Sequence, residues 1–189
     1  MKILAVEASG AVASAALIED DILRAEFTLN HKMTHSQTIM PLINEIKEYL
    51  ELQRDLLKVE GVEKLTILIS AATAKGLAMG IKKPIVPVSA LAGLAYNVYM
   101  TSALICPIVD ARRNQVYTAF YKWNRGRLEC VSQDRIAMID EVLAEAASFE
   151  MPVIFVGDGI FVHRDKLTAN ESFTVAPASC NMQRAASVA

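Results

Sequence analysis

One short unit occurs in both halves of this chain. An apolar run ends at an acidic residue, a tight turn follows, and a second run of small and β-branched residues comes next. The acids are Glu7 in the first copy and Asp110 in the second. Short apolar runs bounded by turn residues predict β-strands, so each copy predicts a β-hairpin. The repeat favours an α/β chain of two similar halves, although a duplicated hairpin identifies no function by itself.

Helical and strand-like periods fill the rest of each half. In residues 36–50 the apolar side chains Ile39, Leu42, Ile43, Ile46 and Leu50 fall on one face at helical spacing, which predicts a helix. Residues 65–69 fit either a buried strand or an apolar helical turn. We expect two β-β-β-α-β-α lobes, residues 1–100 and 101–189. Further helices are predicted over residues 71–79, 89–99, 139–148 and 179–189 and after Gly159, and further strands over residues 22–29, 85–88, 127–135 and 153–156.

Composition limits the classes of partner. The net charge of −2 gives no global field that draws the chain to nucleic acid or anionic lipid, so an RNA contact needs a local patch. Residues 84–109 carry no charged side chain and are long enough to span a bilayer, but prolines near the ends and internal polar residues favour a strand, a buried helix and a strand. Glu7 interrupts the apolar run that an export signal needs. We expect a cytoplasmic protein without a membrane segment.

Metal and catalytic motifs are not recognisable. The three cysteines form no C-x-x-C pair, and His31 and His35 share helical spacing without a third ligand nearby. The chain contains no G-x-S-x-G and no H-E-x-x-H. We therefore expect no metal site, no catalytic residue and no protease activity.

The turns that would hold a nucleotide in an ATPase are incomplete. Phosphate binding needs close approach of the backbone, which glycines permit. Arg112 and Arg113 are bulky at this place after Asp110, and the glycines of Gly157-Asp158-Gly159 form too short a motif to be specific. We expect these segments to be connecting turns, and no ATP turnover by the chain alone.

One region combines cations with aromatic residues, a combination that can hold phosphates and stack bases. On alternating strands, one set can instead face solvent and the other the core, and the sequence leaves both readings open. The candidate RNA contacts are Arg112, Arg113, Lys122, Arg125 and Arg127, interleaved with Tyr117, Tyr121 and Trp123.

Several motifs together carry a family resemblance. The runs ATAKGLA (72–78) and VDARRNQVY (109–117), with ILAVEAS at the start, His35-Ser36, PVSAL (87–91) and VGDG (156–159), resemble the TsaB (YeaZ) family. The resemblance implies two lobes of the actin-like, sugar-kinase-like ATPase (ASKHA) fold. It also implies a part in threonylcarbamoyladenosine modification of tRNA, as a non-catalytic scaffold that activates the catalytic paralogue TsaD.

The same resemblance implies partners and an interface. The helices 36–50 and 71–79 resemble those that pair with TsaD, and homodimers use much the same surface. A TsaE-like ATPase docks at the junction of the pair, so ATP or ADP is expected at the complex interface and no cofactor on this chain alone. Contact with tRNA is expected through the complex. The expected interface residues are His35, Ser36, Ile39, Met40, Ile43, Ile46, Ala71, Ala74, Lys75, Leu77 and Ala78.

Two departures from the family pattern stand out. The glycine-rich loop GPGSFTGLRIG is replaced in residues 60–70 by EGVEKLTILIS. The sequence also ends earlier than is usual for the family, so we expect the second lobe to lack a final helix and strand. Two alternatives remain open, an ATP-binding kinase or ATPase of the same fold and a homodimeric structural protein without a TsaD partner.

Overall fold

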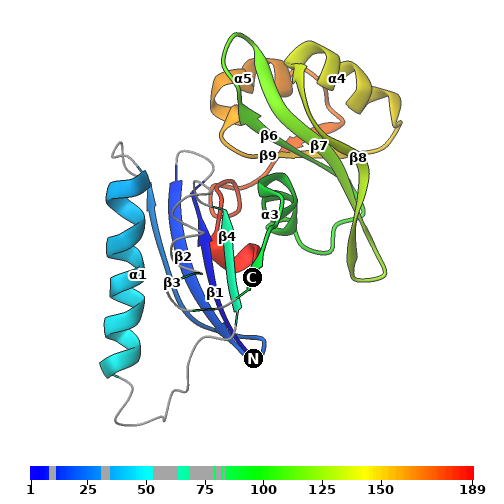
Figure 1. Ribbon diagram of the computed structural model, residues 1–189. Coiled ribbons are helices and arrows are strands. Elements are labelled where there is room, and N and C mark those ends of the chain that lie inside the picture. The colour runs from blue at the N-terminus through cyan, green and yellow to red at the C-terminus, as the bar shows by residue number, and fades with distance from the viewer. Residues whose placement is uncertain (9–11, 31–34, 53–63, 69–78, 80–81, 83) are drawn as a thin grey trace. The chain divides into compact units, whose positions relative to one another are not determined.

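A computed structural model describes residues 1–8, 12–30, 35–52, 64–68, 79, 82 and 84–189 (Figure 1). The chain forms two compact units, Met1–Ala90 with Gln183–Ala189, and Leu91–Met182. The sequence placed the division at residue 100 and kept residues 101–189 together. The structure differs because the helix after Ser89 packs on the second sheet, whereas residues 185 and 188 pack on the first.

The first unit contains one five-stranded sheet. Its order is β3-β2-β1-β4-β5, with antiparallel pairing in the β1–β2–β3 part and parallel pairing from β1 through β4 to β5. The β2–β3 turn has positive φ at Asp20 and Asp21, as tight hairpin turns of the primed types require. The elements are β1 Lys2–Glu7, β2 Val12–Glu19, β3 Ile22–Asn30, α1 His35–Leu52, β4 Lys64–Leu68, β5 Ile85–Val86 and the 3₁₀ turn η1 Ala185–Ser187.

The second unit repeats this strand order. Its sheet runs β8-β7-β6-β9-β10, with β6–β7–β8 antiparallel and β6–β9–β10 parallel. The two matching sheets confirm the predicted two-lobe α/β architecture. The elements are α3 Ala90–Tyr96, β6 Leu104–Asp110, β7 Gln115–Asn124, β8 Arg127–Met138, α4 Ile139–Ser148, β9 Val153–Val156, α5 Gly159–Leu167 and β10 Phe173–Val175.

One predicted helix does not form, and one short strand was not predicted. The helix predicted over residues 179–189 is wrong, because only the 3₁₀ turn η1 forms there. Arg184 is extended (φ −134°, ψ 134°), which lets the following backbone N–H groups reach side chains of β2 and β3. The three-residue strand β10 was not predicted, since its alternation is too short to detect.

The core of each unit follows from the helical and strand periodicities of its apolar residues. In the first, Ile39, Leu42 and Ile46 of α1 pack on Ala15 and Leu17 of β2. Each such side chain contributes about 1.5–3 kcal/mol of gross burial energy. In the second, α4 and α5 cover one face of the sheet and α3 covers the other.

Candidate functional site

Helix α1 carries the residues that were expected to bind a partner. Ile39 is 1% exposed and Ile46 is 2% exposed, and both belong to the core of the first unit. Ile43 is half-buried and packs against the same core. The placement of Ile39 and Ile46 at a partner interface is therefore corrected, because a helix on a sheet buries positions i, i+3 and i+7 against that sheet.

The opposite side of α1 is the surface that remains. Met40, Pro41, Asn44, Glu45 and Glu48 are exposed, and Met40 is 41% exposed. We call these five residues the outer face of α1. Figure 1 shows α1 along one face of the first sheet, with no described element of that unit over its other side. The outer face therefore offers the apolar side chain of Met40 and the carboxylates of Glu45 and Glu48. It also carries Pro41, which lacks the N–H group for a helical hydrogen bond.

Part of the predicted interface lies outside the described residues. His35 and Ser36 begin α1. The divergent segment 60–70 lies outside the described residues apart from β4. Also outside the described residues are His31, Ala71, Ala74, Lys75, Leu77 and Ala78.

The turn between β6 and β7 is a second candidate site. Residues 112–114 all have positive φ, at 65°, 54° and 59°. The Arg112 N–H donates to Asp110 Oδ1 at 3.0 Å, the Ala111 N–H donates to the Gln115 carbonyl at 2.9 Å, and the Gln115 N–H donates to the Arg112 carbonyl at 3.0 Å. Three N–H groups that could face an anion are thus bonded within the turn. In the first unit, the corresponding acid Glu7 is 1% exposed.

The Gly157-Asp158-Gly159 turn packs tightly on β6. A Cβ at Gly157 would lie 2.2 Å from the Ile108 carbonyl oxygen, and Gly157 has φ of +117°. Its N–H donates to Asn181 Oδ1 at 2.6 Å. Asp158 Oδ1 accepts the Asp110 N–H at 3.1 Å, and burial raises the pKa of Asp158. Gly157 is thus required by the contact with β6, which agrees with a connecting turn.

The five candidate RNA contacts do not form one patch. Arg112 and Arg113 precede β7, whereas Arg125 follows it, and the ten residues of β7 separate them by about 30 Å. Cross-strand pairs place Lys122 with Glu129 and Trp123 with Leu128, so Lys122 lies on the face opposite Trp123.

The aromatic members of this region serve the core. Tyr121 and Trp123 are 4% and 8% exposed. The Tyr121 hydroxyl donates to Asp134 Oδ1 at 3.0 Å, and Trp123 Nε1 donates to the Val98 carbonyl at 2.7 Å. Tyr117 is 48% exposed. Of the two readings of this region, the structure favours the division into a solvated set and a core set.

The chain matches known proteins over most of its length. Residues 23–188 match the family model described as TsaD, tRNA N6-adenosine threonylcarbamoyltransferase. The tRNA threonylcarbamoyladenosine biosynthesis protein TsaB of Bacillus subtilis is 34% identical over 172 residues, which cover 88% of this chain and 75% of that protein. This chain belongs to the TsaB family.

Further similarities agree with membership in the TsaB family. Escherichia coli TsaB is 28% identical over 72% of this chain and 64% of its own length. The structure of Pseudomonas aeruginosa YeaZ superposes with a TM-score of 0.74 at 18% identity, over 99% of this chain and 88% of that one. A second Pseudomonas aeruginosa structure, described as similar to peptidase YeaZ, reaches 0.78 at 17% identity, with the same two coverages. These superpositions agree with the two-lobe fold.

His163 of this TsaB-family chain is buried, and the sequence predicted no role for it. It is 4% exposed, lies at a kink in α5 (φ −116°, ψ 17°), and its Nε2 has no hydrogen-bond partner among the described residues. Burial lowers the pKa of His163, and the Asp110 carboxylate opposes this change. No periodicity distinguishes a buried histidine from an exposed one in so short a helix.

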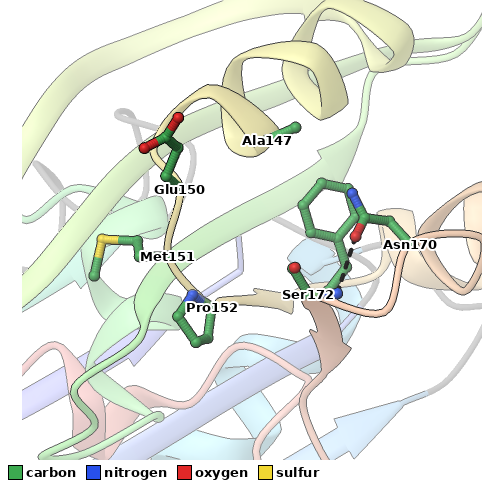
Figure 2. Close-up of a pocket in the computed structure, with 7 residues that line it drawn as sticks. Ala147, Glu150, Met151, Pro152, Asn170 and Ser172 are labelled. Atoms are coloured by element: carbon green, nitrogen blue, oxygen red, sulfur yellow. Dashed lines mark hydrogen bonds between the residues drawn. The ribbon is translucent and has the colours of Figure 1, made fainter.

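A cavity of about 160 Å³ lies at the N-terminal ends of β9 and β10 (Figure 2). The Asn170 side chain points toward Ser172 and accepts its backbone N–H at 2.9 Å. Ala147, Glu150, Met151, Pro152 and Phe173 complete the wall. Among the described residues, no helix is both long and apolar enough to cross a membrane, and no three His, Cys, Asp or Glu side chains group as metal ligands.

Proposed function

We propose that this chain is a non-catalytic subunit in the synthesis of threonylcarbamoyladenosine in tRNA, and that it binds a TsaD-like transferase through the outer face of α1. The names of the relatives support the pathway. The match to a transferase family model, in a chain whose relatives are named TsaB, supports a paralogous pair. In this proposal the chain acts in the cytoplasm.

The hydrogen bonds within the β6–β7 turn support the proposal that this chain is non-catalytic. The Ala111, Arg112 and Gln115 N–H groups donate to acceptors within the turn, so a phosphate would have to displace them. Gly157 is accounted for by the close contact with Ile108. These observations argue against the alternative of an ATP-hydrolysing kinase. ATP or ADP would instead be held at the interface of the complex, together with a TsaE-like ATPase.

The chain would act by differential binding. A subunit that binds the active conformation of its partner better than the inactive one shifts the population toward the active one. The outer face of α1 suits this role because its residues are not needed by the core beneath it, whereas Ile39, Leu42 and Ile46 hold the helix on the sheet. A homodimer could use the same surface, and the experiment below separates the two occupants.

Reconstitution tests the proposal. The chain is mixed with the TsaD-like and TsaE-like proteins of its host, tRNA and the threonylcarbamoyl donor system, and modified adenosine is measured by mass spectrometry. We expect modification only when the TsaD-like protein is present, and no ATP hydrolysis by this chain alone. Modification by the chain without the TsaD-like protein would contradict a non-catalytic role.

A matched pair of variants tests the surface. Met40→Asp places a charge on the outer face of α1, whereas Met100→Asp changes a methionine that is 59% exposed in the second unit. We expect Met40→Asp to weaken binding to the TsaD-like protein about tenfold, with Met100→Asp unchanged, both measured by calorimetry. Equal affinities would place the interface elsewhere, and loss of self-association alone would favour the homodimer.

A further inference from the structure

We propose that residues 184–188 form a strap that opens from the first sheet without unfolding it, and that Glu26 is the latch of this strap. The strap comprises Arg184, the 3₁₀ turn η1 and Val188. It lies on the face of the first sheet opposite α1, and the described residues that it contacts there belong to β1, β2 and β3, with the partly buried Val88 at the edge of the same cluster.

The latch is a single carboxylate that receives several donors. Glu26 Oε2 accepts from Arg184 Nε at 3.2 Å and also from Arg184 Nη2. Glu26 Oε1 accepts the Ala186 N–H at 3.1 Å. Both oxygens of Glu26 are therefore bonded to the strap. The Glu26 side chain is 11% exposed while that of Arg184 is 43% exposed, so solvent reaches the strap side of this pair more readily than the sheet side.

A second contact lies two positions away in the β2–β3 register, on the same face of the sheet. Ser14 Oγ accepts the Ala185 N–H at 3.1 Å and shares a hydrogen bond of 2.9 Å with Thr28 Oγ1. Ser14 pairs with Thr28, and Ala16 pairs with Glu26, in the β2–β3 register. Residues two apart along a strand share a face, so these four side chains form one surface. The side-chain oxygens of Ser14 and Glu26 that accept from the strap therefore lie in a row on one face of the sheet.

The apolar contacts under the strap are small. Ala5 and Ala16 pair across β1 and β2 and meet Ala185 and Val188 of the strap. All four are nearly or fully buried, with Val188 at 5% exposed. Because alanine and valine methyl groups bury little area, opening the strap costs less hydrophobic free energy than lifting a helix with leucine side chains.

The strap can separate because the sheet does not depend on it for its backbone pairing. Strand β2 pairs with β1 along the whole length of β1, and with β3 except for a register shift between Leu17 and Ile18. The Ala185 and Ala186 N–H groups of the strap donate to side chains of β2 and β3 rather than to the backbone of these strands. Elements with few buried apolar contacts open locally below the global unfolding free energy. Opening would expose Ser14, Ala16 and Glu26 as a face that fits an arginine followed by two small residues.

Hydrogen exchange of the full chain tests the latch. Glu26→Gln keeps the shape of the side chain and removes its charge, and charged hydrogen bonds are stronger than neutral ones. We expect the Ala185 and Ala186 amides to exchange on the order of tenfold faster in this variant, with β1 and β2 amides unchanged. The matched control is Glu19→Gln, which alters a carboxylate of the same sheet that pairs with Lys2 and Arg24 instead.

Two outcomes would overturn the strap. Unchanged exchange at Ala185 and Ala186 in Glu26→Gln would show that Glu26 is no latch. Faster exchange across β1, β2 and the strap together would show that the strap is part of the cooperative core. The charge exchange Glu26→Arg with Arg184→Glu supplies a further check, and it is expected to recover part of the protection that Glu26→Arg alone loses.

A peptide supplies the second measurement. Ala185→Asp places a charge at a fully buried position and is expected to release the strap. A labelled peptide with the sequence of residues 183–189 should then bind this variant measurably and the unaltered chain at least tenfold more weakly. A peptide with glutamate in place of the arginine serves as the control. Equal binding of the two peptides would overturn recognition by Glu26.

Discussion

The two sheets share one strand order but are covered differently. On the second sheet, α3 places Leu91 and Leu94 against Ile105, Tyr121 and Trp123. On the matching face of the first sheet, the strap places Ala185 and Val188 against Ala5 and Ala16. The size of the sheet side chains differs with the element that covers them. Large side chains lie under the leucines of α3, whereas only the methyl groups of Ala5 and Ala16 lie under the strap, whose backbone comes close to the sheet. Strand order is therefore repeated between the units, while the strength of the cover is not.

The largest expected effect comes from breaking the stronger cover. Leu94 is fully buried, and Leu94→Ala should destabilise the second unit by about 2–5 kcal/mol. The single tryptophan, Trp123, lies beside this contact and is also contacted by Tyr96 and Tyr99, so its fluorescence in urea reports this unit. Val188→Ala in the strap is the matched change. It removes two methyl groups and should cost about 1.5 kcal/mol, at about 0.8 kcal/mol for each, as followed by far-ultraviolet circular dichroism in urea. Similar costs would remove the distinction between the two covers.

A smaller effect is expected from overfilling the weaker cover. Ala16 is fully buried beneath the strap, and Ala16→Leu should cost about 1–3 kcal/mol or displace the strap. Urea unfolding followed by far-ultraviolet circular dichroism gives the cost, and limited proteolysis after Arg184 reports displacement. Ala25→Leu, at a half-buried position on the α1 side, is the control. A variant with unchanged stability and unchanged proteolysis would show that the strap face has spare room.

Acid should weaken the second unit through His163. The pKa of His163 is lowered in the folded chain, chiefly by burial, so the unfolded chain binds the proton first as pH falls below about 6.5. Stability that is present above this pH is therefore lost as pH falls toward the folded pKa. Asp158 has the opposite sign, because its raised pKa removes stability as pH rises above about 3.8.

The variant His163→Gln isolates the histidine. Its stability, followed by Trp123 fluorescence between pH 7 and pH 5 at about half-unit steps, should fall less steeply than that of the unaltered chain. The contribution of Asp158 is common to both proteins and cancels in the comparison. Parallel curves would mean that His163 does not titrate differently on folding.

The smallest expected effect compares the helices that follow the third strand of each sheet. Helix α4 begins with Asp140 and Glu141, and Glu141 Oε2 accepts the Met138 N–H at 3.2 Å, whereas α1 has no acidic residue in its first turn. Glu141→Ala should cost about 0.5–1 kcal/mol. Glu48→Ala, on the exposed side of α1, should change stability by less than about 0.5 kcal/mol. A larger cost for Glu48→Ala, measured in the same urea series, would reverse the ranking.

The local periodicity of apolar residues predicted most of the fold. The spacing of Ile39, Leu42 and Ile46 predicted α1, and the repeated acid-and-turn unit predicted both hairpins, because these signals are local. The partner surface was not readable in the same way. Apolar residues on a helix face indicate burial, but not whether the chain's own sheet or another protein buries them, and here the sheet takes Ile39 and Ile46.

The sequence by itself determined the two-lobe α/β class, the incomplete phosphate turns and, through motifs such as ATAKGLA and VDARRNQVY, the family. These properties depend on neighbouring residues or on fixed short spacings. Only the tertiary structure decided that α3 serves the second sheet, that Trp123 packs beside Tyr96 of α3, and that residues 184–188 close over Ser14 and Glu26. Such contacts join residues far apart in the chain, and Ala185 and Glu26 carry no local signal of each other. Their free energy depends on which faces meet in space, and short-range pattern does not specify this.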